Sequence, residues 1–197
     1  MLRHMHFKAI TVLLCLGTAA MAQTKGAITW KMAFLKGEIV NPIVQDIAKP
    51  IEMKNGDNFQ LFIQVVQPQA CVYALFVGID GTVAVLENDT LLEGDAVLLP
   101  SQRETYTITP PGGTELMYII VASSPQAKLD ALLAKAKKDN DAILDEVKRI
   151  QLSGSTIAEA PQKPVPIGGV FRGGTTSLQA VQFEGQSSYV KIIRIKH

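Results

Sequence analysis

The sequence predicts a mainly β protein, either an antiparallel β-sandwich or an open barrel, with one long helix inserted at about residues 125–152. Short apolar stretches, separated by Gly, Pro, Asn and Asp turns, are typical of sandwiches and barrels. After residue 124 the apolar residues recur every three or four positions, which indicates a helix. The chain has 197 residues, 47% hydrophobic and 19% charged, as expected for a globular protein.

The first predicted strands lie between residues 28 and 65. An apolar run from Ile28 to Leu35 carries the lone Trp30, and a Pro-punctuated stretch follows it. Lys54-Asn55-Gly56-Asp57 is a turn signal. Apolar residues at every second position from Phe59 to Val65 then predict a half-buried strand.

The next segment reads as a hairpin with a fully buried first strand. Cys71–Val77 is apolar on both faces, which suits a central strand covered on both sides. Asp80-Gly81 is the pair favoured in type I′ hairpin turns, and Val83–Leu86 supplies the partner strand. Asn88-Asp89 predicts a further turn.

Two more strands precede the helix. A short segment closes at Leu98-Leu99-Pro100, and Glu104–Thr109 places Tyr106 and Ile108 on one face. Pro110–Gly113 is a strong break, and the apolar, partly β-branched run from Leu116 to Val121 predicts a buried strand.

The helix prediction rests on spacing and on its ends. Leu, Ile, Val and Ala recur from Leu129 to Ile150 on one helical face. Ser124-Pro125 fits an N-cap followed by Pro at the first helical position, and Gly154 fits the C-terminal stop. Asp139-Asn140-Asp141 is polar enough to kink or split the helix.

The C-terminal part returns to strands. Residues 153–166 are rich in Ser, Ala and Pro and predict a loop. Gln179–Phe183 and Tyr189–Ile195 predict two strands with a turn at Gly185. One face of the last strand carries Tyr189, Lys191, Ile193 and Ile195. We expect a single domain over residues 54–197, preceded by an N-terminal strand and lead-in at 23–53.

Residues 1–22 have the pattern of a secretory signal peptide. Arg3 and Lys8 form the positive region, an apolar run follows, and Ala20-Met21-Ala22 places small residues before a mature start at Gln23. We therefore expect export to the periplasm or beyond. Leu14 precedes Cys15, and lipidation needs a small residue there, so we expect no lipoprotein.

The mature chain would hold few groups for catalysis. Removing residues 1–22 leaves 175 residues with 17 cations and 18 anions, a net charge of −1, with His197 as the sole imidazole and Cys71 as the sole thiol. We expect His197 to lie on a mobile terminus and Cys71 to be buried. A site that pairs a nucleophile with histidine needs a fixed imidazole, and a zinc site needs about four ligands, mostly His and Cys. We therefore expect no enzyme, no metal and no cofactor. Balanced charge argues against a nucleic-acid partner, and no apolar stretch of about 20 residues predicts a membrane span.

The order of the segments resembles the domain of unknown function 4384 family over about residues 54–197. The residues that carry the likeness are Gly56-Asp57, Cys71–Leu75, Asp80-Gly81, Gly94, Leu99-Pro100, Gly113–Glu115, Tyr118–Ser123, Phe171–Gly173 and Tyr189–Ile192. The resemblance implies an all-β accessory domain, which in other bacterial proteins is often joined to a kinase-like or caspase-like module. It implies no catalytic residues, and this sequence shows no such partner module.

Three residues are candidates for a ligand site or an ion pair: Asp57, Glu115 and Arg172. Gly113-Thr114-Glu115 is either a ligand clamp with free backbone N–H groups or a turn that starts a strand. Arg172 has a fork that suits a carboxylate ligand. Its alternative use is a structural ion pair with Glu115 or Asp57.

The acidic residues of the helical region predict a charged helix surface and not a catalytic site. Asp139 and Asp141, or Asp145 and Glu146, are neighbours on one element and read as a solvated helix face, with Asp145 paired to Arg149. They lack the fixed separation that a carboxylate-dependent hydrolase needs.

These observations predict an exported, non-enzymatic binding or scaffolding protein of the bacterial cell envelope. Its partner would be another envelope protein, contacted through sheet edges or loops. Two alternatives are a small carboxylate-dependent hydrolase and a structural oligomer joined through the helix. The ligand and the oligomeric state are left open.

The first testable prediction concerns processing. Because Ala20-Met21-Ala22 suits signal peptidase, protein purified from its native envelope should begin at Gln23. Intact-mass spectrometry and N-terminal sequencing measure this. A retained Met1, or a lipid on Cys15, would contradict it.

Overall fold

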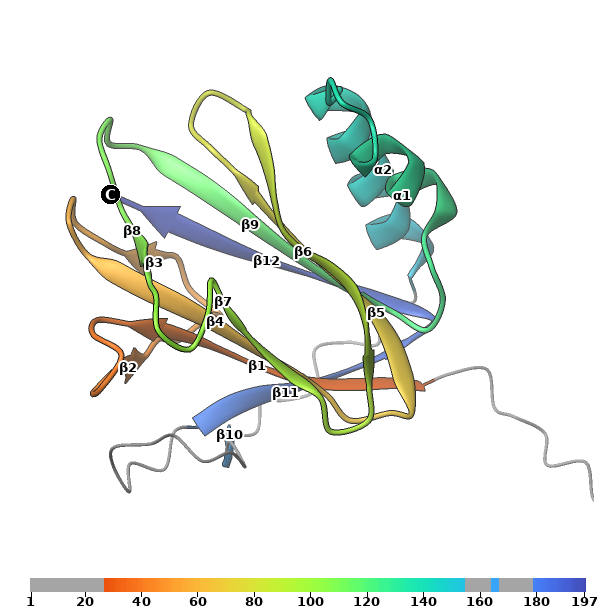
Figure 1. Cartoon of the computed structure of the whole chain (residues 1–197), viewed down its shortest axis with the longest axis horizontal. Helices are drawn as coiled ribbons and strands as arrows, with labels where there is room; N and C mark the ends of the chain where they lie inside the picture. Colours follow the sequence, from red (N-terminus) through yellow and green to blue (C-terminus); the bar gives the residue numbers. More distant parts are fainter. Residues whose placement is uncertain (1–26, 155–163, 167–178) are drawn as a thin grey trace, which may run out of the picture.

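Two β-sheets stack face to face in the computed structural model, which describes residues 27–154, 164–166 and 179–197 (Figure 1). Neither sheet closes into a barrel, and the predicted mainly β fold is confirmed, with its strands in two separate sheets. Sheet A has the order β10 (Pro164–Pro166), β11 (Gln179–Gln186), β1 (Ala27–Lys36), β4 (Asn58–Val65) and β7 (Ala96–Leu99), with β2 (Ile43–Val44) on β1 and β8 (Tyr106–Thr107) on β4. Sheet B has the order β3 (Ile51–Glu52), β12 (Ser188–Lys196), β9 (Thr114–Ala122), β5 (Gln69–Val77) and β6 (Val83–Leu92).

The main hydrophobic core lies between the two sheets. Alternate residues of β1, β4, β5 and β9 point into it, as the period of two along a strand requires. Trp30 is fully buried there and stacks on Phe183 of the neighbouring strand, with ring centroids 4.7 Å apart. The predicted strand around Trp30 is confirmed.

The predicted central strand, β5, is buried on both faces, which confirms that prediction. Ala70, Val72 and Ala74 face the core between the sheets. Cys71, Tyr73, Leu75 and Val77 face the opposite way, into a second core beneath the helices. The Cys71 thiol is free and buried, as expected.

The predicted long helix is two helices, α1 (Ala127–Leu133) and α2 (Asn140–Ser153), which cover the outer face of sheet B (Figure 1). The split falls at the predicted polar stretch because the Asp139 side chain caps α2 and accepts a 3.1 Å hydrogen bond from Ala142 N. At the far end Gly154 is the C-cap, as predicted.

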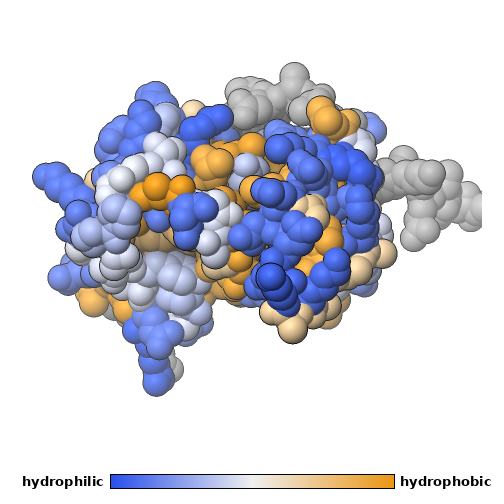
Figure 2. Space-filling model, turned by 90° about the horizontal axis from the view of Figure 1, so that it is seen from above, coloured by the Kyte–Doolittle hydropathy of each residue, from blue (hydrophilic) through white to orange (hydrophobic). Residues whose placement is uncertain are grey.

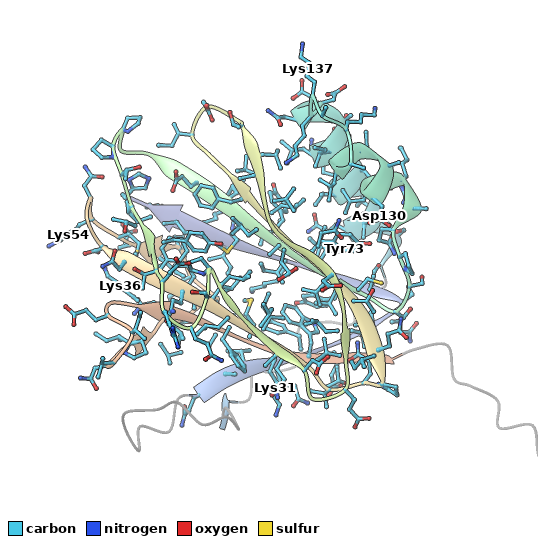
Figure 3. The ribbon with its side chains drawn as sticks, viewed as in Figure 1. Lys31, Lys36, Lys54, Tyr73, Asp130 and Lys137 are labelled. Carbon is cyan, nitrogen blue, oxygen red and sulfur yellow. The ribbon has the colours of Figure 1, made fainter. Side chains whose placement is uncertain are left out.

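The start of α1 differs from the prediction. Its N-cap is Gln126 and not Ser124, and no side chain caps it. The backbone N–H of Gln126 instead donates to the hydroxyl of Tyr73, 2.9 Å away, which ties β5 to the helical layer (Figure 3). Burial, with the nearby Asp130 carboxylate, raises the pKa of Tyr73 to about 12.

One predicted turn is wrong, and the confirmed hairpin turn at Asp80-Gly81 is not of the predicted type I′. Asn88 and Asp89 lie inside β6, an edge strand, where their exposed polar side chains protect the edge from pairing with other chains. Gly81 is the only residue of the Asp80-Gly81 hairpin with positive φ, at 79°, whereas a type I′ turn needs two.

The predicted loop and turn near the C-terminus also change. Pro164–Pro166 pairs with β11 as the short strand β10, and residues 155–163 of the predicted loop lie outside the described residues. The chain turns at Ser187, whose φ is 55°, and not at Gly185, which pairs with Ile28 inside β11. This turn passes the chain from sheet A to sheet B.

The surface carries mostly polar side chains. Seen from above, it is hydrophilic with small, separate hydrophobic patches (Figure 2). Within the described ranges, no helix is long and apolar enough to cross a membrane.

The core predicts a large cost for truncating Trp30. Trp30→Ala should lower the free energy of unfolding by about 3–5 kcal/mol, because it removes a fully buried indole and leaves a cavity. Urea unfolding followed by circular dichroism measures this. Ile43→Ala, at a side chain 66% exposed, is the control and should change it by less than about 0.5 kcal/mol. Equal effects of the two substitutions would contradict this account of the core.

Candidate functional site

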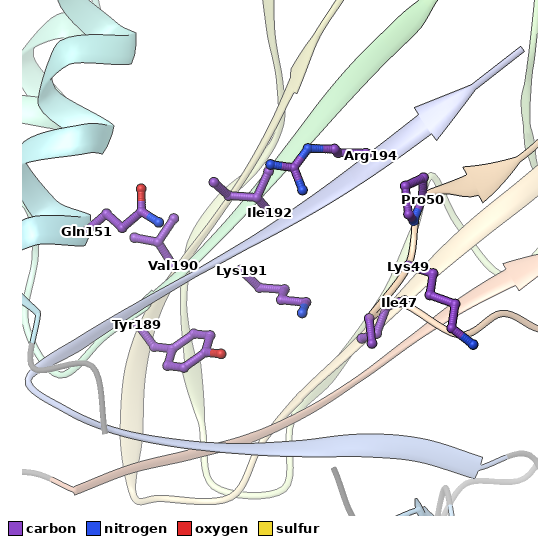
Figure 4. Close-up of a pocket in the computed structure, with 10 residues that line it drawn as sticks. Ile47, Lys49, Pro50, Gln151, Tyr189, Val190, Lys191, Ile192 and Arg194 are labelled. Carbon is purple, nitrogen blue, oxygen red and sulfur yellow. The ribbon is translucent and has the colours of Figure 1, made fainter. Parts of the chain in front are cut away.

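A surface pocket of about 230 Å³ lies between β12 and the loop that joins β2 to β3 (Figure 4). The loop crosses from sheet A to sheet B at the open side of the sandwich. The lining residues come from that loop, from β12 and from the end of α2: Ile47, Ala48, Lys49, Pro50, Gln151, Tyr189, Val190, Lys191, Ile192 and Arg194.

Lys191 is the most unusual residue of this pocket. It lies on the same face of β12 as Ile193 and Ile195, which belong to the core between the sheets. Lys191 is only 7% exposed, and its ammonium lies 5.6 Å from the ring centroid of Phe183. Lysine is rarely buried to this degree. The methylene stem of Lys191 lies in an apolar environment, and its ammonium is directed toward the pocket.

The pocket has an excess of positive charge. Lys49, Lys191 and Arg194 line it, and Asp46 is the carboxylate paired with Lys49, with an N–O distance of 3.2 Å. A hydrogen bond from the backbone N–H of Ala48 lowers the pKa of Asp46, with further contributions from Lys49 and Lys191. Asp46 is therefore ionised at neutral pH. Arg194 forms no ion pair with any described residue.

Asp57, a sequence candidate, lies in a different place. It forms a 2.7 Å ion pair with Lys36 at one end of the sandwich, where Figure 3 labels Lys36 and Lys54. The Lys36 ammonium, together with the backbone N–H of Lys54, lowers the pKa of Asp57. This geometry closes the turn between β3 and β4, and Asp57 takes no part in the pocket.

Glu115 lies at the same end of the sandwich but pairs with His197. The imidazole Nε2 is 3.3 Å from Oε2 of Glu115, without a well-aligned hydrogen bond. The contact is an ion pair only when the imidazole is protonated. Burial raises the pKa of Glu115, and the neighbouring His197 partly opposes that shift.

The expectation of a mobile His197 is wrong. Its side chain is fully buried, and its backbone exchanges two hydrogen bonds with Gly113, at 2.7 and 3.0 Å. Because the Gly113 N–H is used in this ladder, Gly113-Thr114-Glu115 has the geometry of a turn that starts β9.

Some candidates lie outside the described residues. They include Arg172, so its predicted pairing with Glu115 or Asp57 stays a prediction. The cleavage residues Ala22 and Gln23 also lie outside. The structure thus places Asp57 and Glu115 at one end of the sandwich, in separate ion pairs.

The prediction that Glu146 belongs to a solvated helix face is wrong. Its side chain is fully buried against α1, with Lys128 Nζ 2.8 Å from Oε2 and Arg149 Nε donating at 2.9 Å to Oε1. The predicted pair of Asp145 with Arg149 is also wrong, because Asp145 contacts Lys148 instead. The Arg149 hydrogen bond is the main cause that lowers the pKa of Glu146. These contacts link α1 to α2.

Sequence reasoning missed the pocket, although its signal was present. The alternation of β12 placed Lys191 on the inward face with Ile193 and Ile195. A cation at an inward position was the sign that this part of the strand borders an opening. The contribution of Lys49 depends on a loop between two sheets, which strand patterns do not reveal.

Other chemistry has little support in the part of the chain that is described. No group of three or more His, Cys, Asp or Glu side chains there could hold a metal ion. Comparison with family models, with curated proteins and with solved structures finds no match to this chain. The resemblance to the domain of unknown function 4384 family therefore stays a prediction.

Glu146 allows a prediction about stability and pH. Glu146→Gln should lower the free energy of unfolding at pH 7 by about 1–3 kcal/mol, because it leaves two cations without their carboxylate. A carboxyl whose pKa is lowered by folding stabilises the protein above its ordinary value of 4.5, and that contribution is lost at lower pH. The difference from wild type should therefore shrink as pH falls below about 4.5.

Urea unfolding at pH 7, 5, 4 and 3 measures this difference. Asp145→Asn, at a side chain 76% exposed, is the matched control on α2 and should change stability by less than about 0.5 kcal/mol at pH 7. A Glu146→Gln effect that is equally small, or that grows on acidification, would contradict the prediction.

Proposed function

We propose that this protein is an exported, non-enzymatic binding protein of the bacterial cell envelope, which holds its partner at the cation-lined pocket beside β12. The observation that carries the proposal is the placement of Lys191, a nearly buried cation on an inward strand position that borders the pocket. A strand of the sandwich core holds this cation, and sites built on strands position their groups well.

The arrangement of carboxylates favours binding over hydrolysis. Acid–base hydrolysis by two carboxylates needs both groups on one bond, about 5–10 Å apart. Asp57, Glu115 and Glu146 instead each contact a different basic partner. Asp57 contacts Lys36, Glu115 contacts the His197 imidazole, and Glu146 contacts Lys128 and Arg149.

The helices offer little support for assembly through an apolar stripe. Their large apolar residues pack onto sheet B: Leu129, Leu132, Leu133, Ile143, Val147 and Ile150. Leu152 is 87% exposed, but a single exposed Leu is ordinary on a protein surface. Export itself rests on the signal-peptide pattern of residues 1–22 and is tested by the processing experiment.

The binding role predicts that partner retention depends on pocket charge. Tagged mature protein should retain a specific component from solubilised envelope extract, and Arg194→Glu should reduce that retention at least tenfold, because it reverses a pocket cation. Lys148→Glu on the exposed face of α2 is the matched charge reversal and should retain the component like wild type. Quantitative mass spectrometry of the eluates measures this. Retention of nothing above background, or equal loss in both variants, would refute the proposal.

A further inference from the structure

One edge of β12 is largely without a strand partner among the described residues. On one side β12 pairs with β9 along its whole length, from Ser188 to Lys196. On the other side β3 pairs with only its last two residues, Ile195 and Lys196. At the start of β12, Gly154 packs against the Ser188 carbonyl. Between Val190 and Arg194, no strand of the described part of the chain pairs with this edge.

The backbone groups of this edge point into the pocket. The carbonyl of Lys196 accepts a 2.8 Å hydrogen bond from Met53 N, on the β3 side of the strand. Because backbone direction alternates along a strand, the N–H and C=O groups of Val190, Ile192 and Arg194 point to that same side. These three residues line the pocket.

The way β3 begins explains why it pairs with so little of the β12 edge. Pro50 immediately precedes β3 and has no N–H to donate to a ladder. Before it, the chain turns away at Asp46–Lys49, with Lys49 N donating to Asp46 O at 3.3 Å. An added strand along Val190–Arg194 would be collinear with β3, and the paired part would span about 16 Å at 3.3 Å per residue.

The charges beside this edge select an acidic strand. Arg194 lies on the face of β12 toward the helices, Lys191 on the face toward sheet A, and Lys49 on the loop opposite (Figure 4). Side chains of an added strand alternate between the same two faces. Opposite charges across a strand pair stabilise it and like charges destabilise it.

We propose that an extended acidic peptide segment of a partner protein adds to the free edge of β12, with its backbone on Val190, Ile192 and Arg194 and its carboxylates toward Lys191, Arg194 and Lys49. This inference rests on the proposed binding role and names the chemical class of the partner. Main-chain hydrogen bonds supply affinity in such strand addition, and side-chain contacts supply selectivity.

The test uses two fluorescent heptapeptides with the mature protein at low salt. One is Thr-Glu-Glu-Thr-Glu-Glu-Thr, which places carboxylates on both faces of an added strand, and the other has Gln in place of each Glu. The acidic peptide should bind at least tenfold more tightly in fluorescence anisotropy. The double variant Lys49→Glu, Arg194→Glu should lose this preference. Lys148→Glu should keep it, since Lys148 lies on α2 outside the pocket.

Hydrogen exchange distinguishes strand addition from simple charge attraction. The amides of Val190, Ile192 and Arg194 should become protected when the acidic peptide is bound, and inorganic phosphate should not reproduce this protection. Equal binding of the two peptides, unprotected amides at saturation, or protection by phosphate alone would overturn the inference. Should the acidic peptide fail while envelope extract still yields a component that Arg194→Glu loses, the binding role stands and the strand-addition inference is refuted.

Discussion

The burial of β5 on both faces is the constraint on which the rest of the structure depends. A strand with apolar residues on both faces needs cover on two sides. Sheet A covers the face that carries Ala70, Val72 and Ala74, and the helices cover the face that carries Tyr73 and Leu75. The helical segment between β9 and β11 is thus a required layer of the fold, and Tyr73 fastens it by accepting a hydrogen bond from Gln126 N.

The same layering explains why the pocket lies beside β12. β12 is the last strand of sheet B in the sequence, and among the described residues only the short β3 pairs with its outer edge. Its inward residues change from Ile193 and Ile195, next to β3, to Lys191 and Tyr189 at the open side. A lysine fits such a boundary because its methylene stem packs on apolar groups while its ammonium reaches polar surroundings.

Much of the sandwich could be predicted because its strands follow simple periods. The two-faced apolar run of β5 and the alternation of β4 depend on nearest neighbours in sequence, and both were predicted. The errors concern features decided by distant contacts. Asn88 and Asp89 resemble a turn, yet the edge of sheet B continues through them because β5 pairs with them.

The candidate site was harder to predict for the same reason. In the sequence Glu146 is one of several charged residues of a helix, and its pairing depends on Lys128 of the separate helix α1. His197 gains its fixed position from Gly113, which is 84 residues earlier in the chain. The pocket joins a loop at Lys49 to a strand at Lys191, two segments that sequence patterns treat as independent.

Both ends of β12 are held, and this bears on how its open edge would bind. At one end Ser123 N donates to Ser187 O at 2.9 Å, and at the other His197 and Gly113 extend the ladder with β9. An edge fixed at both ends loses little conformational freedom when a strand adds to it, so the ordering cost falls mainly on the incoming segment. The hydrogen bonds between His197 and Gly113 would thus support the proposed binding without contacting the pocket, because they hold one end of β12 in its register with β9.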